Sequence, residues 1–156
     1  MAEDNKDNAG VVVIPPVMFL AALVLGFLID WVWPVALLPG NGQYIVGGVL
    51  MTAALVFGMW GRILFTRFGT NVEPFKPTTA IITSGPFAYS RNPLYLSLFV
   101  LYTGIAILAD NAWLLALAVP LFFMVRYGVI AREERYLEQK FGETYLAYKR
   151  RVRRWL

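Results

Sequence analysis

The sequence predicts an all-α integral membrane protein with about four membrane-spanning helices. Hydrophobic residues make up 58% of the 156 residues and charged residues only 15%, against about 45–50% and about 25% in soluble domains. The hydrophobic residues lie in long uncharged tracts, namely 31–61, 92–109 and 111–125. A soluble core rarely runs so far without a charged face, so a buried soluble domain is the less favoured alternative.

Four apolar runs define the expected spans. At about 1.5 Å per residue, the first run is just long enough to cross roughly 30 Å of hydrocarbon. Pro15 and Pro16 precede it, and tryptophans at its far end suit the depth of the lipid headgroups. The fourth run is expected to continue past Arg126, with a bend at Pro120. The expected spans are 17–33, 44–61, 94–109 and 113–130.

The polar ends divide the chain further. We expect residues 1–10 to be disordered, 11–130 to form the transmembrane domain, and 131–156 to form a cytoplasmic, amphipathic helical tail that is interrupted at Gly142.

The distribution of basic residues predicts the orientation. All but one of the 14 lysines and arginines lie within 62–91 or from Arg126 onward, and the turns at 34–43 and 110–112 contain none. By the positive-inside rule, both termini and the loop between the second and third spans face the cytoplasm. The net charge of +4 therefore reflects topology and anionic lipid, and no nucleic-acid partner is expected.

The chain contains no cysteine and no histidine. Zinc sites of the usual Cys/His kind, thiol nucleophiles and Ser-His-Asp machinery are therefore excluded within this chain, and no metal cofactor is expected.

The stretch from Ser84 to Tyr95, Ser-Gly-Pro-Phe-Ala-Tyr-Ser-Arg-Asn-Pro-Leu-Tyr, is the first candidate for a functional site. Proline disfavours the α conformation in the residue before it, so the third helix is expected to begin at Pro93, with Asn92 extended. The free N–H groups of that helix start, beside Arg91, suit an anion such as a carboxylate. A topological arginine at an ordinary helix start is the alternative.

Glu133 and Glu134 follow the last span directly. Neighbouring helical residues point about 100° apart, so one glutamate can face a polar site while the other pairs with a neighbouring arginine. Such a carboxylate can accept hydrogen bonds from ribose hydroxyls or attract a cation; ordinary solvated helix charge is the alternative. Arg126 would be costly facing lipid, so it either snorkels to the surface or lines a polar cavity.

The final segment predicts a basic amphipathic helix from Glu143 to Leu156. Tyr145, Tyr148, Val152 and Trp155 recur every three to four residues, with five basic residues between them. Such a helix suits the headgroup region, and RNA binding is the less favoured alternative.

Taken together, these segments resemble the integral-membrane methyltransferases that include isoprenylcysteine carboxyl methyltransferases and phospholipid N-methyltransferases. That family's motif reads Ser-Gly-Pro-Tyr-x-x-x-Arg-(His or Asn)-Pro-x-Tyr, followed by Glu-Glu and then by Phe-Gly-x-x-Tyr-x-x-Tyr-x-x-x-Val. The corresponding positions here are 84–95, 133–134 and 141–152, and the resemblance extends over about 69–152.

The resemblance implies a methyltransferase that uses S-adenosylmethionine at the cytoplasmic face of the membrane. It implies an amphipathic acceptor that enters from the lipid, such as an isoprenylcysteine-type carboxylate. The alternatives are a phospholipid amine, a small thiol, or a non-catalytic membrane adaptor with a basic lipid-binding tail. Arg126 is the candidate for orienting the acceptor, and Glu133 and Glu134 are candidates for catalytic roles. The implied cofactor-binding residues are Tyr89, Arg91, Asn92, Pro93, Tyr95, Glu133, Glu134 and Leu137.

Two positions depart from the family pattern. Asn92 stands where the eukaryotic carboxyl methyltransferases have histidine, and Ser97 stands where the family often has glycine. Without histidine, deprotonation of an acceptor would fall to Glu133, Glu134 or a tyrosine. Because a carboxylate or thiolate needs no base, this absence favours such acceptors over an amine.

Overall fold

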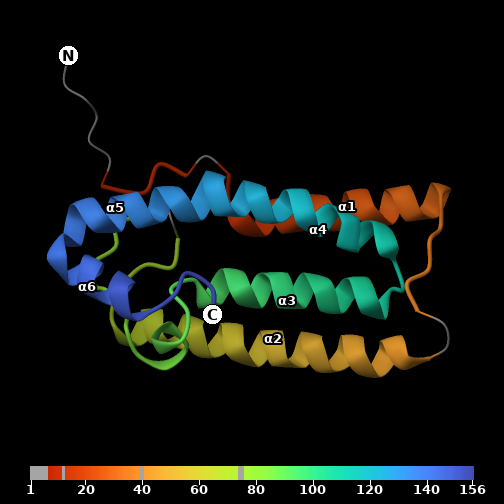
Figure 1. Cartoon of the computed structure of the whole chain (residues 1–156), viewed down its shortest axis with the longest axis horizontal. Helices are drawn as coiled ribbons and strands as arrows, with labels where there is room; N and C mark the ends of the chain where they lie inside the picture. Colours follow the sequence, from red (N-terminus) through yellow and green to blue (C-terminus); the bar gives the residue numbers. More distant parts are fainter. Residues whose placement is uncertain (1–6, 12, 39–40, 74–75) are drawn as a thin grey trace, which may run out of the picture.

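The computed structural model describes residues 7–11, 13–38, 41–73 and 76–156, and the described chain is entirely helical (Figure 1). Residues 1–10 were expected to be disordered, and residues 1–6 of this segment lie outside the described residues. The helices are α1 (Pro15–Val32), α2 (Gly42–Arg67), the 3-10 turn η1 (Gly85–Ala88), α3 (Pro93–Leu108), α4 (Ala112–Val125), the π-helical segment η2 (Arg126–Ile130), α5 (Ala131–Phe141) and α6 (Glu143–Arg151).

The predicted spans agree with these helices to within two residues at most ends. The exception is α2, which continues six residues beyond the expected end to Arg67. Three helices are long and apolar enough to cross a membrane: α1, α2 and the continuous helix Ala112–Phe141. The shorter apolar helix α3 lies between α2 and α4 in the bundle (Figure 1). The all-α membrane fold is therefore confirmed.

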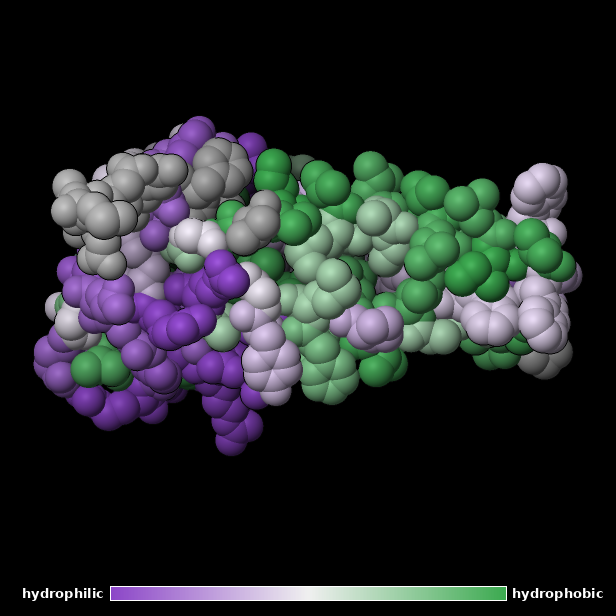
Figure 2. Space-filling view, turned by 90° about the horizontal axis from the view of Figure 1, so that it is seen from above, coloured by the Kyte–Doolittle hydropathy of each residue, from purple (hydrophilic) through white to green (hydrophobic). Residues whose placement is uncertain are grey.

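The surface has the two zones expected of a membrane protein. In Figure 2 a hydrophobic surface covers most of the bundle's length, and one end is strongly hydrophilic. Leucine, isoleucine and valine side chains of α1 and α2 are exposed over this length, which suits contact with lipid chains. At the end far from α5 and α6, the indole N–H of Trp113 donates a hydrogen bond to the Trp33 carbonyl at 2.7 Å.

Close backbone approach joins α2 to α3. A Cβ atom added at Gly47 would lie 2.8 Å from the backbone nitrogen of Leu108, and one added at Gly104 would lie 3.1 Å from the backbone nitrogen of Met51. Glycine is therefore required at both positions for the helices to pack this closely. The adjacent Gly48 takes no part in this contact, since nothing lies within 4 Å of a Cβ added there.

A second core joins α1, α3 and α4. Phe19, Tyr102, Leu114 and Val125 are almost completely buried there. Asn111, fully buried, caps α4 by accepting a hydrogen bond from the Leu114 amide at 3.1 Å and donates another to the Gly26 carbonyl at 3.3 Å. Satisfying polar groups in this way is required inside an apolar bundle.

The helix that begins at Ala112 leaves the membrane without ending. The π-helical segment η2 joins α4 to α5, as the expected continuation past Arg126 requires. Gly142, with φ of +50°, then ends α5 and starts α6.

The expected basic helix over 143–156 is wrong in its second half. Helix α6 ends at Arg151, and Val152 is extended, so the chain turns back toward α3 (Figure 1). Tyr145 and Tyr148 are only 2% and 3% exposed, so they face the protein and not the headgroup region. The spacing of Tyr145 and Tyr148 therefore marks a face of α6 that packs against the protein and not against the membrane.

Candidate functional site

A cavity of about 410 Å³ lies at the hydrophilic end of the bundle. Seven of the eight predicted cofactor-binding residues line it: Arg91, Asn92, Pro93, Tyr95, Glu133, Glu134 and Leu137. The eighth, Tyr89, is 67% exposed and lies outside the lining. Arg126 also lies outside it, with its guanidinium 5.5 Å from the ring centre of Tyr127.

The cavity brings together segments that are far apart in the sequence. The predicted motif supplies the start of α3, and the two glutamates come from α5. Helix α6 adds Tyr145 and Tyr148, the two tyrosines of the terminal family pattern. Further lining residues that the sequence did not predict are Ala9 and Ile14 before α1, Pro15 and Pro16 at its start, and Arg62 on α2.

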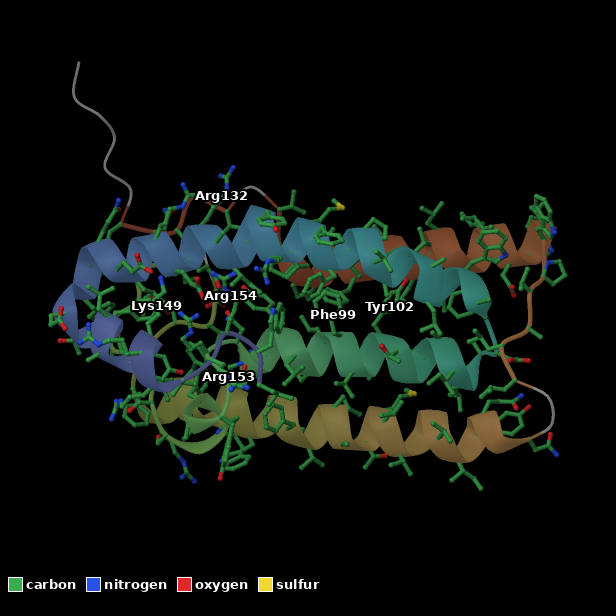
Figure 3. All side chains as sticks on the ribbon, viewed as in Figure 1. Phe99, Tyr102, Arg132, Lys149, Arg153 and Arg154 are labelled. Carbon is green, nitrogen blue, oxygen red and sulfur yellow. The ribbon has the colours of Figure 1, made fainter. Side chains whose placement is uncertain are left out.

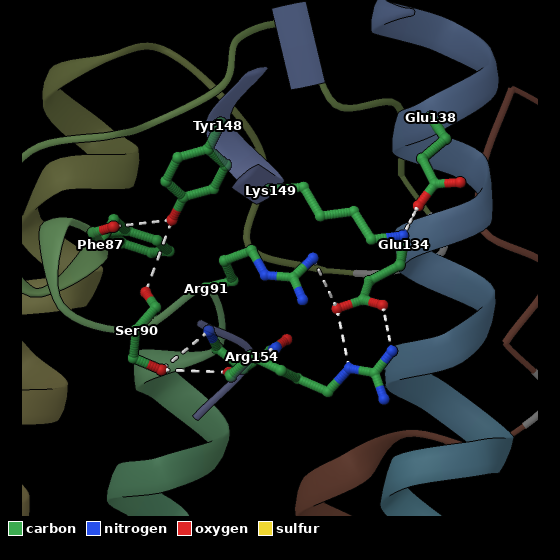
Figure 4. Close-up of polar contacts among 9 residues, drawn as sticks. Phe87, Ser90, Arg91, Glu134, Glu138, Tyr148, Lys149 and Arg154 are labelled. Atoms are coloured by element: carbon green, nitrogen blue, oxygen red, sulfur yellow. Dashed lines mark hydrogen bonds and ion pairs between the residues drawn. The ribbon is translucent and has the colours of Figure 1, made fainter. Parts of the chain in front are cut away.

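Two arginines hold Glu134, which is 5% exposed (Figure 4). The guanidinium of Arg154 donates to both carboxylate oxygens, from Nε at 3.0 Å and from Nη2 at 2.6 Å. Nη1 of Arg91 lies 3.1 Å from Oε1 of Glu134. Two guanidinium groups thus face one carboxylate, which leaves one positive charge in excess at this end of the cavity.

Arg91 is the least satisfied charged group of the site. Its side chain is 8% exposed, and its buried Nε and Nη1 atoms donate no hydrogen bond within the described chain. Its contact with Glu134 is an ion pair without hydrogen-bond geometry. Buried donors are normally paired, so unpaired guanidinium donors beside a cavity indicate an anionic ligand.

Glu133, the neighbour of Glu134, also lines the cavity but has a different partner. The Tyr95 hydroxyl donates to its Oε1 at 2.7 Å. Burial raises the pKa of Glu133 to about 7; the hydrogen bond from Tyr95 opposes this shift, and the neighbouring Glu134 adds to it. The adjacent glutamates therefore have different environments, as the 100° helical offset predicted: Glu134 binds arginines and Glu133 binds a tyrosine.

The motif segment before α3 is fixed by hydrogen bonds to the end of the chain. The Tyr148 hydroxyl donates to the Phe87 carbonyl at 2.7 Å, and the Asn92 side-chain amide donates to the Arg154 carbonyl at 3.0 Å (Figure 4). Asn92 has φ of −129° and ψ of 51°, outside the α region, and α3 begins at Pro93 as predicted. Asn92 thus positions the segment as well as lining the cavity.

Sequence reasoning missed Arg154. In the sequence it is one of several basic residues near the end of the chain, and only the turn after Arg151 aims it at Glu134 (Figure 3). No group of three or more His, Cys, Asp or Glu side chains suited to a metal ion occurs in the described ranges.

The fold and the site together define a helical membrane protein with a cavity at the polar end of its bundle that charged side chains line. The model of the phospholipid methyltransferase family matches residues 42–144, more than half of the chain. The chain belongs to this family, as the resemblance predicted.

One of the relatives is a methyltransferase by name. The chain is 35% identical over 129 residues to the protein-S-isoprenylcysteine O-methyltransferase of Schizosaccharomyces pombe, covering 81% of this chain and 51% of that protein. It is 26% identical over 119 residues to the nickel-cobalt-cadmium resistance protein NccN of Alcaligenes xylosoxydans xylosoxydans, covering 70% of this chain and 52% of that protein. The chain thus spans about half the length of these two relatives.

A third relative is shorter. An uncharacterized protein of Haemophilus influenzae is 46% identical over 66 residues, which are 40% of this chain and the whole of that protein. No solved structure matches the chain significantly.

Proposed function

We propose that the protein transfers a methyl group from S-adenosylmethionine to an amphipathic acceptor at the cytoplasmic face of the membrane. The observation that carries the proposal is the buried Arg91 guanidinium, whose Nε and Nη1 atoms donate no hydrogen bond within the described chain and which lines the cavity.

The residues present fit S-adenosylmethionine by charge. The excess positive charge of Arg91 and Arg154 over Glu134 suits its carboxylate. The carboxylate of Glu133 suits a cationic group, the ammonium or the sulfonium. The predicted helix-start contact at Pro93 and the predicted roles of Asn92, Tyr95 and Leu137 remain part of this proposal, since all four residues line the cavity.

When bound, the cofactor supplies an activated methyl group. Displacement at a sulfonium needs alignment and exclusion of water more than a metal or a covalent nucleophile. The residues of this chain bind and orient: Arg91 holds the carboxylate, and Tyr145 and Tyr148 cover the cavity from the polar side. Arg126 lies outside the cavity lining, so orienting the acceptor would require the guanidinium to reach it from the end of α4.

The acceptor is proposed to reach the cavity from the lipid between α1 and α2. Two other interfaces in the bundle are closely packed: glycines bring α2 against α3, and the rings of Phe99, Phe122 and Trp155 pack between α3 and α4 with centres 5.3–6.0 Å apart. Helices α1 and α2 make almost no contact. Ile14 and Pro16, at the start of α1, are exposed and also line the cavity.

A carboxylate of the isoprenylcysteine type is the first acceptor proposed, because the Schizosaccharomyces pombe relative carries that activity in its name and a carboxylate needs no base. The position of Glu133 favours a second candidate, a phospholipid amine or a thiol, which must lose a proton. Burial raises the pKa of Tyr145 to about 12, which makes it a poor base near neutral pH, and Glu134 is held by two arginines. Glu133 is thus the available base.

Binding and acceptor tests separate these possibilities. Calorimetry with the detergent-purified protein should show S-adenosylmethionine binding that is weakened in Arg91→Ala. A membrane adaptor would bind no cofactor. With binding established, an S-prenylated cysteine and phosphatidylethanolamine are compared as acceptors in wild-type and Glu133→Gln protein: carboxylate methylation should survive the substitution, and amine methylation should not.

A further inference from the structure

We infer that Arg154 is a positioning residue for the cofactor site and that the 152–156 strap, the segment that follows α6, holds both halves of that site together. This inference rests on the proposed function and extends it to a segment that lies outside residues 42–144, the part of the chain that the family model matches.

The backbone of the strap binds the motif before α3. The Arg153 carbonyl accepts a hydrogen bond from the Arg91 amide at 3.0 Å. The Arg154 carbonyl accepts from the Ser90 hydroxyl at 3.3 Å and from the Asn92 side chain at 3.0 Å. Three consecutive residues that end at the start of α3 are therefore fixed by two consecutive carbonyls of the strap, and one of the three carries the guanidinium proposed to hold the cofactor.

The side chains of the strap bind elsewhere. The Arg154 guanidinium reaches Glu134 on α5, and the Trp155 ring lies 5.3 Å from that of Phe122 on α4 and 6.0 Å from that of Phe99 on α3. Trp155 thus anchors the strap inside the bundle. Because the carbonyls hold one half of the site and the guanidinium holds the other, the strap sets the distance between Arg91 and Glu134.

Charge explains why this matters for the ligand. Glu134 is buried and needs cationic partners. The Arg154 guanidinium donates a hydrogen bond to each carboxylate oxygen of Glu134. Nη1 of Arg91 makes only an ion-pair contact of 3.1 Å with Oε1, and Nε of Arg91 has no hydrogen-bond partner within the described chain. Without Arg154, Glu134 would take Arg91 as its only cationic partner, the donors would be used, and the excess positive charge would be lost. Arg154 therefore keeps Arg91 free for a carboxylate without contacting that carboxylate itself.

The neighbouring Arg153 provides a matched control. It also contributes a backbone carbonyl, but its side chain is exposed and makes no recorded ion pair within the described chain. Arg153→Gln and Arg154→Gln remove the same charge from adjacent positions and leave both carbonyls in place. Only the second substitution removes the contact with Glu134.

The experiment measures binding of S-adenosylmethionine and of its decarboxylated form, which differ only in the carboxylate, to the detergent-purified full chain. Arg154→Gln should weaken binding of S-adenosylmethionine about 10- to 100-fold, as expected for a hydrogen-bonded charge contact, and binding of the decarboxylated form less than about threefold. Arg153→Gln should leave both unchanged. Arg154→Lys, with one point charge in place of two parallel donors, should give an intermediate loss.

Two results would overturn the inference. One is Arg154→Gln protein that binds S-adenosylmethionine like the wild type. The other is an equal loss for both ligands in folded protein, which would mean that the strap acts on stability alone. If wild-type protein bound neither ligand, the proposed function would fail together with the inference.

Discussion

Cofactor binding should depend on pH through Glu133. Burial holds the pKa of this carboxyl at about 7 in the free protein, and a cationic ligand binds the ionised form. About one molecule in eleven is ionised at pH 6 and about three in four at pH 7.5, so binding should be about eightfold tighter at the higher pH. Calorimetric titration at both values, with S-adenosylmethionine, measures the ratio.

Two variants identify the group responsible. Glu133→Gln cannot ionise, so its affinity should be low and independent of pH over this range. Tyr95→Phe removes a hydrogen bond that favours the ionised carboxylate, so the midpoint of the pH dependence should move upward by about one unit. Equal wild-type affinity at pH 6 and 7.5, or an unchanged slope in Glu133→Gln, would refute the reasoning.

Three further outcomes are expected. The ligand-free protein should lose thermal stability as pH rises from 4.5 through about 7, because the raised pKa of Glu133 favours the folded state only while the carboxyl is neutral; Glu133→Gln should flatten this trend in thermal scans at pH 5.5 and 8. Gly47→Ala should destabilise the protein by about 1–3 kcal/mol through a clash with α3, whereas Gly48→Ala should not, and equal thermal denaturation midpoints for the two variants would contradict the packing. Since the chain lacks cysteine, the variants Asn41→Cys and Lys76→Cys can each be labelled in right-side-out vesicles with a membrane-impermeant maleimide. Asn41→Cys should react from outside and Lys76→Cys should not. The reverse result would place the cavity on the other face of the membrane.

The fold was predictable because its dominant signals are local. Uncharged tracts, prolines and basic flanks each act within a single helix. For three of the four long apolar helices, the predicted bounds lie close to those in the structure. The extension of α2 to Arg67 was not predictable from hydropathy, because the added turns carry Arg62 and Arg67 and lie at the polar end. Arg62, which appeared to mark the end of the helix, instead lies within α2 and lines the cavity.

The site was predictable only as far as the family motif reaches. Arg91, Tyr95 and the two glutamates were named from the motif, and the structure brings them to one cavity. Tyr89 was also named from the motif, but its side chain is exposed and lies outside the cavity lining. The role of Arg154 depends on the turn after α6, and nothing in the local sequence marks where that turn leads.

The arrangement also explains how this family's chemistry can work in a chain without histidine. Most polar groups of the cavity are engaged with one another: Glu134 with Arg154, Tyr95 with Glu133, and Tyr148 with the Phe87 carbonyl. They are therefore held in place before any ligand arrives. Nε and Nη1 of Arg91 donate no hydrogen bond within the described chain, and burial raises the pKa of Glu133 to about 7 although Tyr95 donates to this carboxyl. An anion-binding group and a titrating carboxyl are sufficient for a reaction whose main demand is alignment. The choice of acceptor then rests on whether Glu133 is needed only to attract a cation or also to remove a proton, and the Glu133→Gln variant answers both questions with one protein.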